Sequence, residues 1–144
     1  MVCNDALLQP PLAESERQCG RILIVDDDRD QAFVLATALT RLGFQAAVAH
    51  DLAVATQKIQ DRLPELIILD IRLPDGNGLE VCAKLGDDPK TFATPVVILS
   101  GMESPDIVRR ARTAGCRYFL RKPYDPNSLL LIVENVLADG ESGA

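Results

Sequence analysis

Apolar residues gather in five short stretches along this chain. The stretches are Ile22–Val25, Phe44–Ala49, Leu66–Leu69, Val96–Leu99 and Tyr118–Leu120. A strand whose successive residues are nearly all apolar has no face left for water, which is typical of a parallel sheet covered by helices on both sides. The pattern therefore predicts five buried parallel strands.

The segments between these stretches repeat their apolar residues with the period of a helix. Three helical faces stand out, formed by Ala32, Leu35, Leu39 and Leu42, by Leu52, Ala55, Ile59 and Leu63, and by Leu129, Ile132, Val133 and Val136. Two shorter segments, 79–85 and 107–114, show a weaker repeat. Gly43 and Gly115 stand where a helix end favours a left-handed residue. Five strands alternating with five helices predict a doubly wound α/β domain.

The same pattern sets the expected limits of the domain. Residues 1–20 include the helix-breaking Gln9-Pro10-Pro11 and are expected to be a flexible tail. The domain itself is expected over residues 21–138. Residues 139–144 are small and polar, as in a C-terminal tail or the start of a linker. A chain of 144 residues fits one domain of this kind.

Composition narrows the possible partners. The formal net charge of -6 argues against direct nucleic-acid binding, which usually needs a basic surface. No apolar run approaches the roughly 18 residues of a membrane span. The four cysteines form no Cys-x-x-Cys pair and there is one histidine, so zinc-site spacing is absent. We expect a cytoplasmic protein whose cysteines are reduced thiols.

Polar residues that could form a site follow the first, third, fourth and fifth predicted strands. Asp26, Asp27 and Asp28 follow the first, Asp70 the third, Ser100 the fourth, and Arg121-Lys122 the fifth. Open α/β sheets bind ligands beyond the carboxyl ends of their strands. Neighbouring carboxylates repel one another unless a cation neutralises them, and an all-oxygen ligand set suits Mg²⁺. Taken alone, the Asp26–Asp28 run could equally be a helix N-cap.

Asp70 is followed by proline four positions on and by glycine eight positions on, at Pro74 and Gly78. The chain also has an Ile-Val-Asp-Asp start ending at Asp27, a Leu99-Ser100-Gly101 step and a Lys122-Pro123 pair. These four motifs, in this order and at this spacing, resemble the receiver domains of two-component response regulators over about residues 21–137. The resemblance implies a flavodoxin-like strand order, 2-1-3-4-5, with helices on both faces.

The resemblance also implies a role for each site residue. Asp70 would be the phosphoacceptor, assisted by Lys122 and Ser100. Asp27, Asp70 and the backbone carbonyl of Arg72 would ligate Mg²⁺, and Asp26 would act through water. Ser100 and Phe119 would form the conformational switch, although a plain core aromatic is the other interpretation of Phe119.

The expected partners are a histidine kinase or phosphotransfer protein and an unknown downstream protein, with no nucleic acid or membrane bound directly. The expected output surface lies around residues 107–121. Two alternatives stay open: the receiver portion of a larger transcription regulator, and a phosphate sink in a phosphorelay. Hydrolysis by an aspartate-based phosphatase usually needs a second acid two residues after the nucleophile, where this chain has Arg72. A regulatory protein is therefore expected rather than an enzyme.

Overall fold

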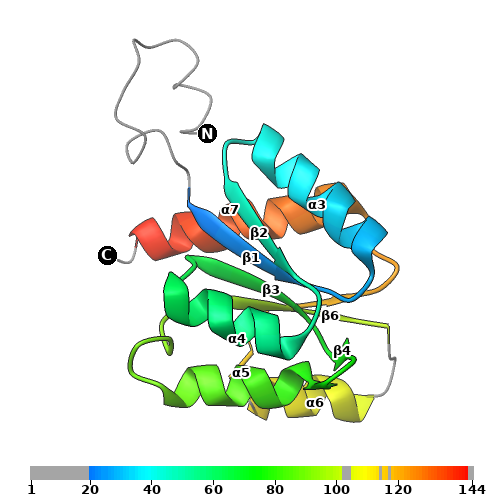
Figure 1. Cartoon of the computed structure of the whole chain (residues 1–144), viewed down its shortest axis with the longest axis vertical. Helices are drawn as coiled ribbons and strands as arrows, with labels where there is room; N and C mark the ends of the chain where they lie inside the picture. Colours follow the sequence, from blue (N-terminus) through cyan, green and yellow to red (C-terminus); the bar gives the residue numbers. More distant parts are fainter. Residues whose placement is uncertain (1–19, 102–104, 114, 117, 143–144) are drawn as a thin grey trace.

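A five-stranded parallel sheet forms the centre of the protein (Figure 1). The computed structural model describes residues 20–101, 105–113, 115–116 and 118–142. The strands of the sheet are β1 (Arg21–Val25), β2 (Gln45–Ala49), β3 (Leu66–Asp70), β6 (Val96–Ser100) and β7 (Tyr118–Arg121). Their spatial order is β2-β1-β3-β6-β7. The predicted strand order is confirmed, because β4 and β5 belong to a separate small hairpin.

Helices cover both faces of this sheet, as the apolar pattern predicts. They are α3 (Arg29–Arg41), α4 (Leu52–Asp61), α5 (Gly78–Asp87), α6 (Pro105–Thr113) and α7 (Pro126–Ser142). Figure 1 shows α3 and α7 on one face and α4, α5 and α6 on the other. No helix in the described part of the chain has both the length and the apolar character needed to cross a membrane.

Two hydrophobic cores result, one on each face of the sheet. Alternate residues of a strand point to opposite faces. Leu69 therefore packs with Leu79 of α5 and Ala111 of α6, in one core. Ile68 packs with Leu35 of α3 and Leu129 of α7, in the other. Every residue of β3 and β6 is buried, which explains why these two stretches are apolar almost throughout.

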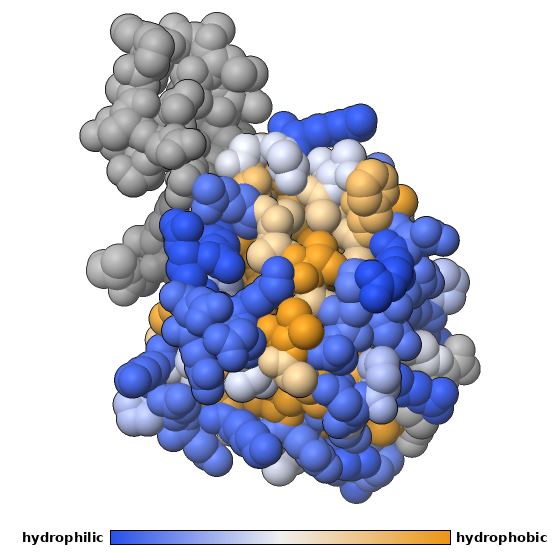
Figure 2. All heavy atoms as spheres, in the orientation of Figure 1, coloured by the Kyte–Doolittle hydropathy of each residue, from blue (hydrophilic) through white to orange (hydrophobic). Residues whose placement is uncertain are grey.

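The edge strand β2 is less covered than the strands beside it. Its residues Gln45 to Val48 are half-buried, and only Ala49 is buried. Figure 2 shows apolar colour gathered in a strip between α3 and α4, surrounded by hydrophilic residues. Because side chains such as Ala46 and Ala47 are small, the apolar surface along this exposed edge stays limited.

Two details depart from the sequence-based expectations. Leu63 is predicted on the apolar face of the second helix, but α4 ends at Asp61 and Leu63 is 47% exposed. The chain turns there towards Pro64, which is buried. Helix α7 continues to Ser142 and so includes the first residues of the expected C-terminal tail. The expected N-terminal tail lies almost wholly outside the described residues.

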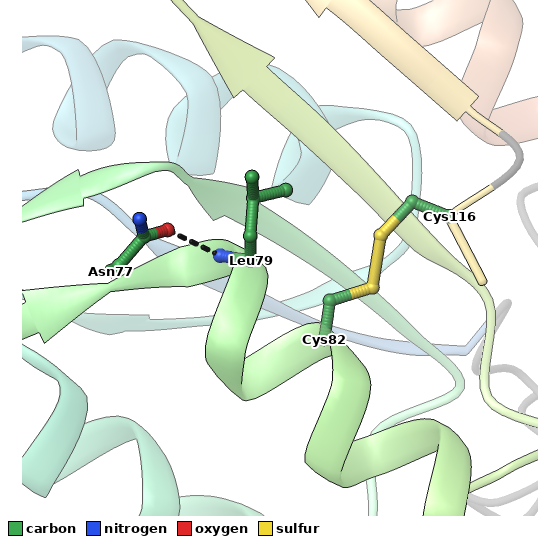
Figure 3. The surroundings of a disulfide bond; sticks show 4 residues. All are labelled: Asn77, Leu79, Cys82 and Cys116. Carbon is green, nitrogen blue, oxygen red and sulfur yellow. Dashed lines mark hydrogen bonds between the residues drawn. A yellow bond between two sulfur atoms is a disulfide. The ribbon is translucent and has the colours of Figure 1, made fainter. Parts of the chain in front are cut away.

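The expectation of reduced thiols is wrong for two of the four cysteines. Cys82 of α5 and Cys116, just before β7, form a disulfide with their Cα atoms 6.8 Å apart (Figure 3). The two residues are separated by 34 positions, but they face the same core from neighbouring elements. Spacing along the chain does not show such a pairing, because it is created by the packing of α5 against the end of the sheet. Cys3 and Cys19 lie outside the described residues.

A short hairpin leaves the sheet directly after β3. Its strands are β4 (Arg72–Leu73) and β5 (Gly76–Asn77), which pair antiparallel. The amide of Gly78 closes the hairpin by donating to the carbonyl of Ile71 at 2.7 Å. A Cβ atom at Gly78 would collide with the backbone carbonyl of Asp70. Glycine at this position is therefore required by the close approach of two backbone segments.

We expect Gly78→Ala to lower the free energy of unfolding by about 1–3 kcal/mol, because overpacking against a rigid backbone forces the chain to shift. Gly101→Ala is the matched control, since a Cβ there meets nothing within 4 Å. Urea unfolding followed by circular dichroism measures both. Equal midpoints for the two variants would contradict this explanation of the glycine.

Candidate functional site

The polar residues predicted to converge lie at the carboxyl edge of four adjacent strands. Asp26 and Asp27 follow β1, Asp70 ends β3, and Ser100 ends β6. Lys122 follows β7, whose Arg121 pairs in register with Ser100. This edge is where an open parallel sheet presents its ligand site. The strand order alone is thus enough to bring the five residues to one rim.

Lys122 joins two of the carboxylates. Its Nζ lies 2.9 Å from Oδ2 of Asp70 and 3.2 Å from Oδ2 of Asp26. Its backbone amide donates to the carbonyl of Ser100 at 2.6 Å, which fixes the chain where it leaves the sheet. The Lys122–Pro123 peptide bond is cis. The Lys122 ammonium therefore lies between Asp26, which follows β1, and Asp70 of β3, while the Lys122 backbone is bonded to β6.

The second carboxylate oxygen of Asp26 and of Asp70 also accepts a hydrogen bond. Oδ1 of Asp26 accepts from the amide of Asp28 at 2.9 Å, and Oδ1 of Asp70 accepts from the amide of Arg72 at 3.2 Å. Asp28 itself is the N-cap of α3, accepting from the amides of Asp30 and Gln31. The helix-cap interpretation of the acidic run is thus correct for its third residue, while the first two lie in the site.

Three carboxylates lie close together at this edge of the sheet. One oxygen from each of Asp26, Asp27 and Asp70 can be chosen so that all three lie within 4.8 Å of one another. The side chains of Asp26 and Asp70 are buried, whereas Asp27 is exposed. Burial raises the pKa of Asp70, and the nearby charge of Asp26 adds to this rise while Lys122 opposes it.

Lys122 remains a cation in this setting. Burial disfavours its charged form, but the hydrogen bond and charge of Asp70, together with Asp26, outweigh burial and raise the pKa of the ammonium. One such charge does not balance three carboxylates. The site therefore has the charge and the oxygen ligands that suit a divalent cation such as Mg²⁺.

Ser100 and Phe119 lie on neighbouring strands. Ser100 is buried at the end of β6. Phe119 pairs in register with Ile98, is half-buried, and packs against the core beneath α4, α5 and α6. Its neighbour Tyr118 packs against the opposite core, as alternation along a strand requires. Phe119 is therefore the aromatic on the same face as α6.

His50 is a neighbour of the site that the sequence pattern does not indicate. It follows β2, and its Nδ1 lies 2.9 Å from the backbone carbonyl of Asp26. A carbonyl only accepts, so Nδ1 donates in this bond. The amide of Asp26 also donates to the carbonyl of Ala49 at 3.0 Å. The end of β2 thus holds the acidic loop in place from its outer side.

Comparison with known proteins shows the family to which the chain belongs. The model of the response regulator receiver domain family matches residues 22–134. The photosynthetic apparatus regulatory protein RegA of Rhodobacter capsulatus is 34% identical over 121 residues, covering 84% of this chain and 63% of RegA. The phosphate regulon transcriptional regulatory protein PhoB of Pseudomonas aeruginosa is 32% identical over 116 residues, covering 81% of this chain and 51% of PhoB.

A solved structure shows the same fold. The CheY-like response regulator receiver domain protein from Methanospirillum hungatei superimposes with a TM-score of 0.81 at 27% identity, covering 86% of this chain and 98% of that one. The chain belongs to the response regulator receiver domain family of two-component signalling, and it is a regulatory domain. It spans between 26% and 63% of the length of the first curated relatives that it matches.

Proposed function

We propose that this chain receives a phosphoryl group on Asp70. The observation that supports this most directly is the position of Lys122, whose ammonium contacts Asp70 and Asp26 at the rim of the sheet. A carboxylate beside a fixed cation, with two further carboxylates able to hold a metal, is the set of groups that phosphoryl transfer to aspartate needs. Membership of the receiver family supports the same role.

In the proposed reaction, an oxygen of Asp70 attacks the phosphorus atom of a phosphohistidine. The new P–O bond forms as the P–N bond breaks, and the imidazole leaves with the electron pair of that bond and takes up a proton. When bound, Mg²⁺ supplies positive charge next to the phosphoryl oxygens. Lys122 pairs with one phosphoryl oxygen and Ser100 donates a hydrogen bond to another. The domain promotes its own phosphorylation in this way but remains a regulator.

The three carboxylates have different proposed roles in binding Mg²⁺. Asp27, Asp70 and the backbone carbonyl of Arg72 would hold the ion directly. Asp26 would act through water. Asp27 is the exposed member of the cluster and would supply its carboxylate as a direct ligand.

The phosphoryl donor is a histidine kinase or a phosphotransfer protein that docks beside this rim. Phe33 and Val34 of α3 are adjacent apolar residues that are 70% and 56% exposed. Val34 also lines a shallow hollow of about 270 Å³ with Pro123 and Tyr124, next to Lys122. A helical donor seated on this apolar surface would bring its phosphohistidine to Asp70.

The output is a change in a protein-binding surface around residues 107–121, read by a downstream protein in the cytoplasm. Ser100 moves towards the phosphoryl group, and Phe119 turns inward behind it.

With a net charge of -6, this chain binds no nucleic acid directly. PhoB is a transcriptional regulatory protein, so an output domain in a longer protein is the alternative that this relative favours.

Asp70→Asn should abolish phosphorylation by acetyl phosphate, because an amide cannot act as the nucleophile. Asp61→Asn, the same change at an exposed helix residue, should be phosphorylated like the wild type. Intact-mass spectrometry after incubation with Mg²⁺ and acetyl phosphate measures the added phosphoryl group. A hydroxylamine-sensitive adduct that persists in Asp70→Asn would exclude Asp70 as the acceptor.

Asp27→Ala should weaken Mg²⁺ binding roughly tenfold, because it removes one direct ligand and one negative charge. Asp28→Asn is the control: it removes a charge from the same loop but keeps an N-cap for α3. Isothermal titration calorimetry gives both dissociation constants. If the two variants bind Mg²⁺ equally well, Asp27 is not a ligand.

Ser100→Ala should still be phosphorylated but should lose the distant structural response. Beryllofluoride, which stands in for the phosphoryl group on Asp70, should shift wild-type amide NMR signals across residues 105–122. In Ser100→Ala those shifts should shrink while the signals of residues touching the ligand still move. Distant shifts of unchanged size in the variant would show that Ser100 does not transmit the change.

A further inference from the structure

The hairpin that follows Asp70 is attached to α4 by one side chain at its tip. Asp75 accepts from the amide of Leu52 at 2.8 Å and from the amide of Ala53 at 3.0 Å, one bond to each carboxylate oxygen. The partners are more than twenty residues away in the sequence. Gly76, next along the hairpin, lies so close to α4 that a Cβ there would be 2.6 Å from Cδ1 of Leu52.

The first amides of a helix have no partners within the helix. In α4 the first three amides donate to the side chains of two different aspartates. Asp51, the N-cap, accepts from Val54 at 2.7 Å, and Asp75 takes the two amides before it. The hydrogen bond from Leu52 holds the pKa of Asp75 below its ordinary value, with Ala53 adding to the effect. The carboxylate is therefore ionised and bonded at neutral pH.

This contact reaches the candidate site through the backbone of the hairpin. Arg72 pairs with Asn77 across the hairpin, and its amide donates to Asp70. Gly78 closes the hairpin onto Ile71. The base of the hairpin is thus fixed by β3 and α5, and Asp75 anchors the tip to a third element. Arg72 is the first residue of β4 and so is part of this hairpin.

We propose that Asp75 is a positioning residue for the metal site. By tying the tip of the hairpin to α4, it orients the Arg72 backbone towards the cation bound by Asp27 and Asp70, without touching that cation. The inference rests on the proposed function, because it concerns the affinity of the same site. The ordinary interpretation is that Asp75 only caps α4, and Asp51 offers a direct comparison for it.

The test compares Asp75→Ala with Asp51→Ala in the full chain. Each variant loses a side chain that caps α4, but only Asp75 connects α4 to the hairpin. Supporting groups around metal ligands commonly affect affinity by about 10- to 100-fold, and we expect about three- to tenfold weaker Mg²⁺ binding for an exposed contact of this kind. Asp51→Ala should bind Mg²⁺ within about twofold of wild type. Asp75→Asn retains an acceptor, so it should fall between Asp75→Ala and wild type.

A second measurement needs no metal. Amide hydrogen exchange by NMR in Mg²⁺-free protein should become faster at Leu52, Ala53, Arg72 and Gly78 in Asp75→Ala. In Asp51→Ala the increase should be confined to the start of α4. Equal Mg²⁺ affinities in the two alanine variants, or unchanged exchange at Arg72 and Gly78, would overturn the positioning role. A wild-type protein that binds no Mg²⁺ would instead overturn the metal assignment in the proposed function.

Discussion

The crowding of carboxylates at the carboxyl edge of the sheet is the constraint around which the rest of this structure is arranged. Asp26 and Asp70 are both nearly buried, and their charges would repel without compensation. Lys122 supplies that compensation from the far end of the chain, 52 residues after Asp70. Its ammonium thus links β1, β3 and the connection after β7. The Lys122 ammonium thus brings the carboxylates together, and their remaining negative charge suits a second, divalent cation.

Much of the fold follows from the apolar pattern, because strands buried on both faces leave a clear trace in the sequence. The strand positions and the strand order agree with the structure. Asp70 and Lys122 meet at the carboxyl edge of the sheet, and Gly78 closes the hairpin that follows β3. For Gly78 the structure adds a physical reason, since the backbone carbonyl of Asp70 leaves no space for a Cβ atom.

The features that the sequence does not reveal all depend on contacts between distant segments. His50 ends a strand and has no motif around it, yet it binds the Asp26 carbonyl. Asp75 resembles an ordinary turn residue after Pro74 until α4 is placed beside it. The Cys82–Cys116 disulfide needs α5 and the start of β7 to be neighbours. The periodicity of apolar residues carries no information about such pairings. It indicates which face of a segment is buried, but not which other segment packs against that face.

Because the interior is divided into two cores, a substitution in one core can leave the packing of the other unchanged. The two hydrophobic clusters have no residue in common among those the structure describes. Phe119, the disulfide and α6 belong to the three-helix layer, whereas α3, with its exposed Phe33, covers the other face. If the proposed function holds, donor recognition and signal output lie on opposite sides of the sheet and could change independently. Repacking beneath α6 would then alter the proposed output surface while the proposed donor surface on α3 stays the same.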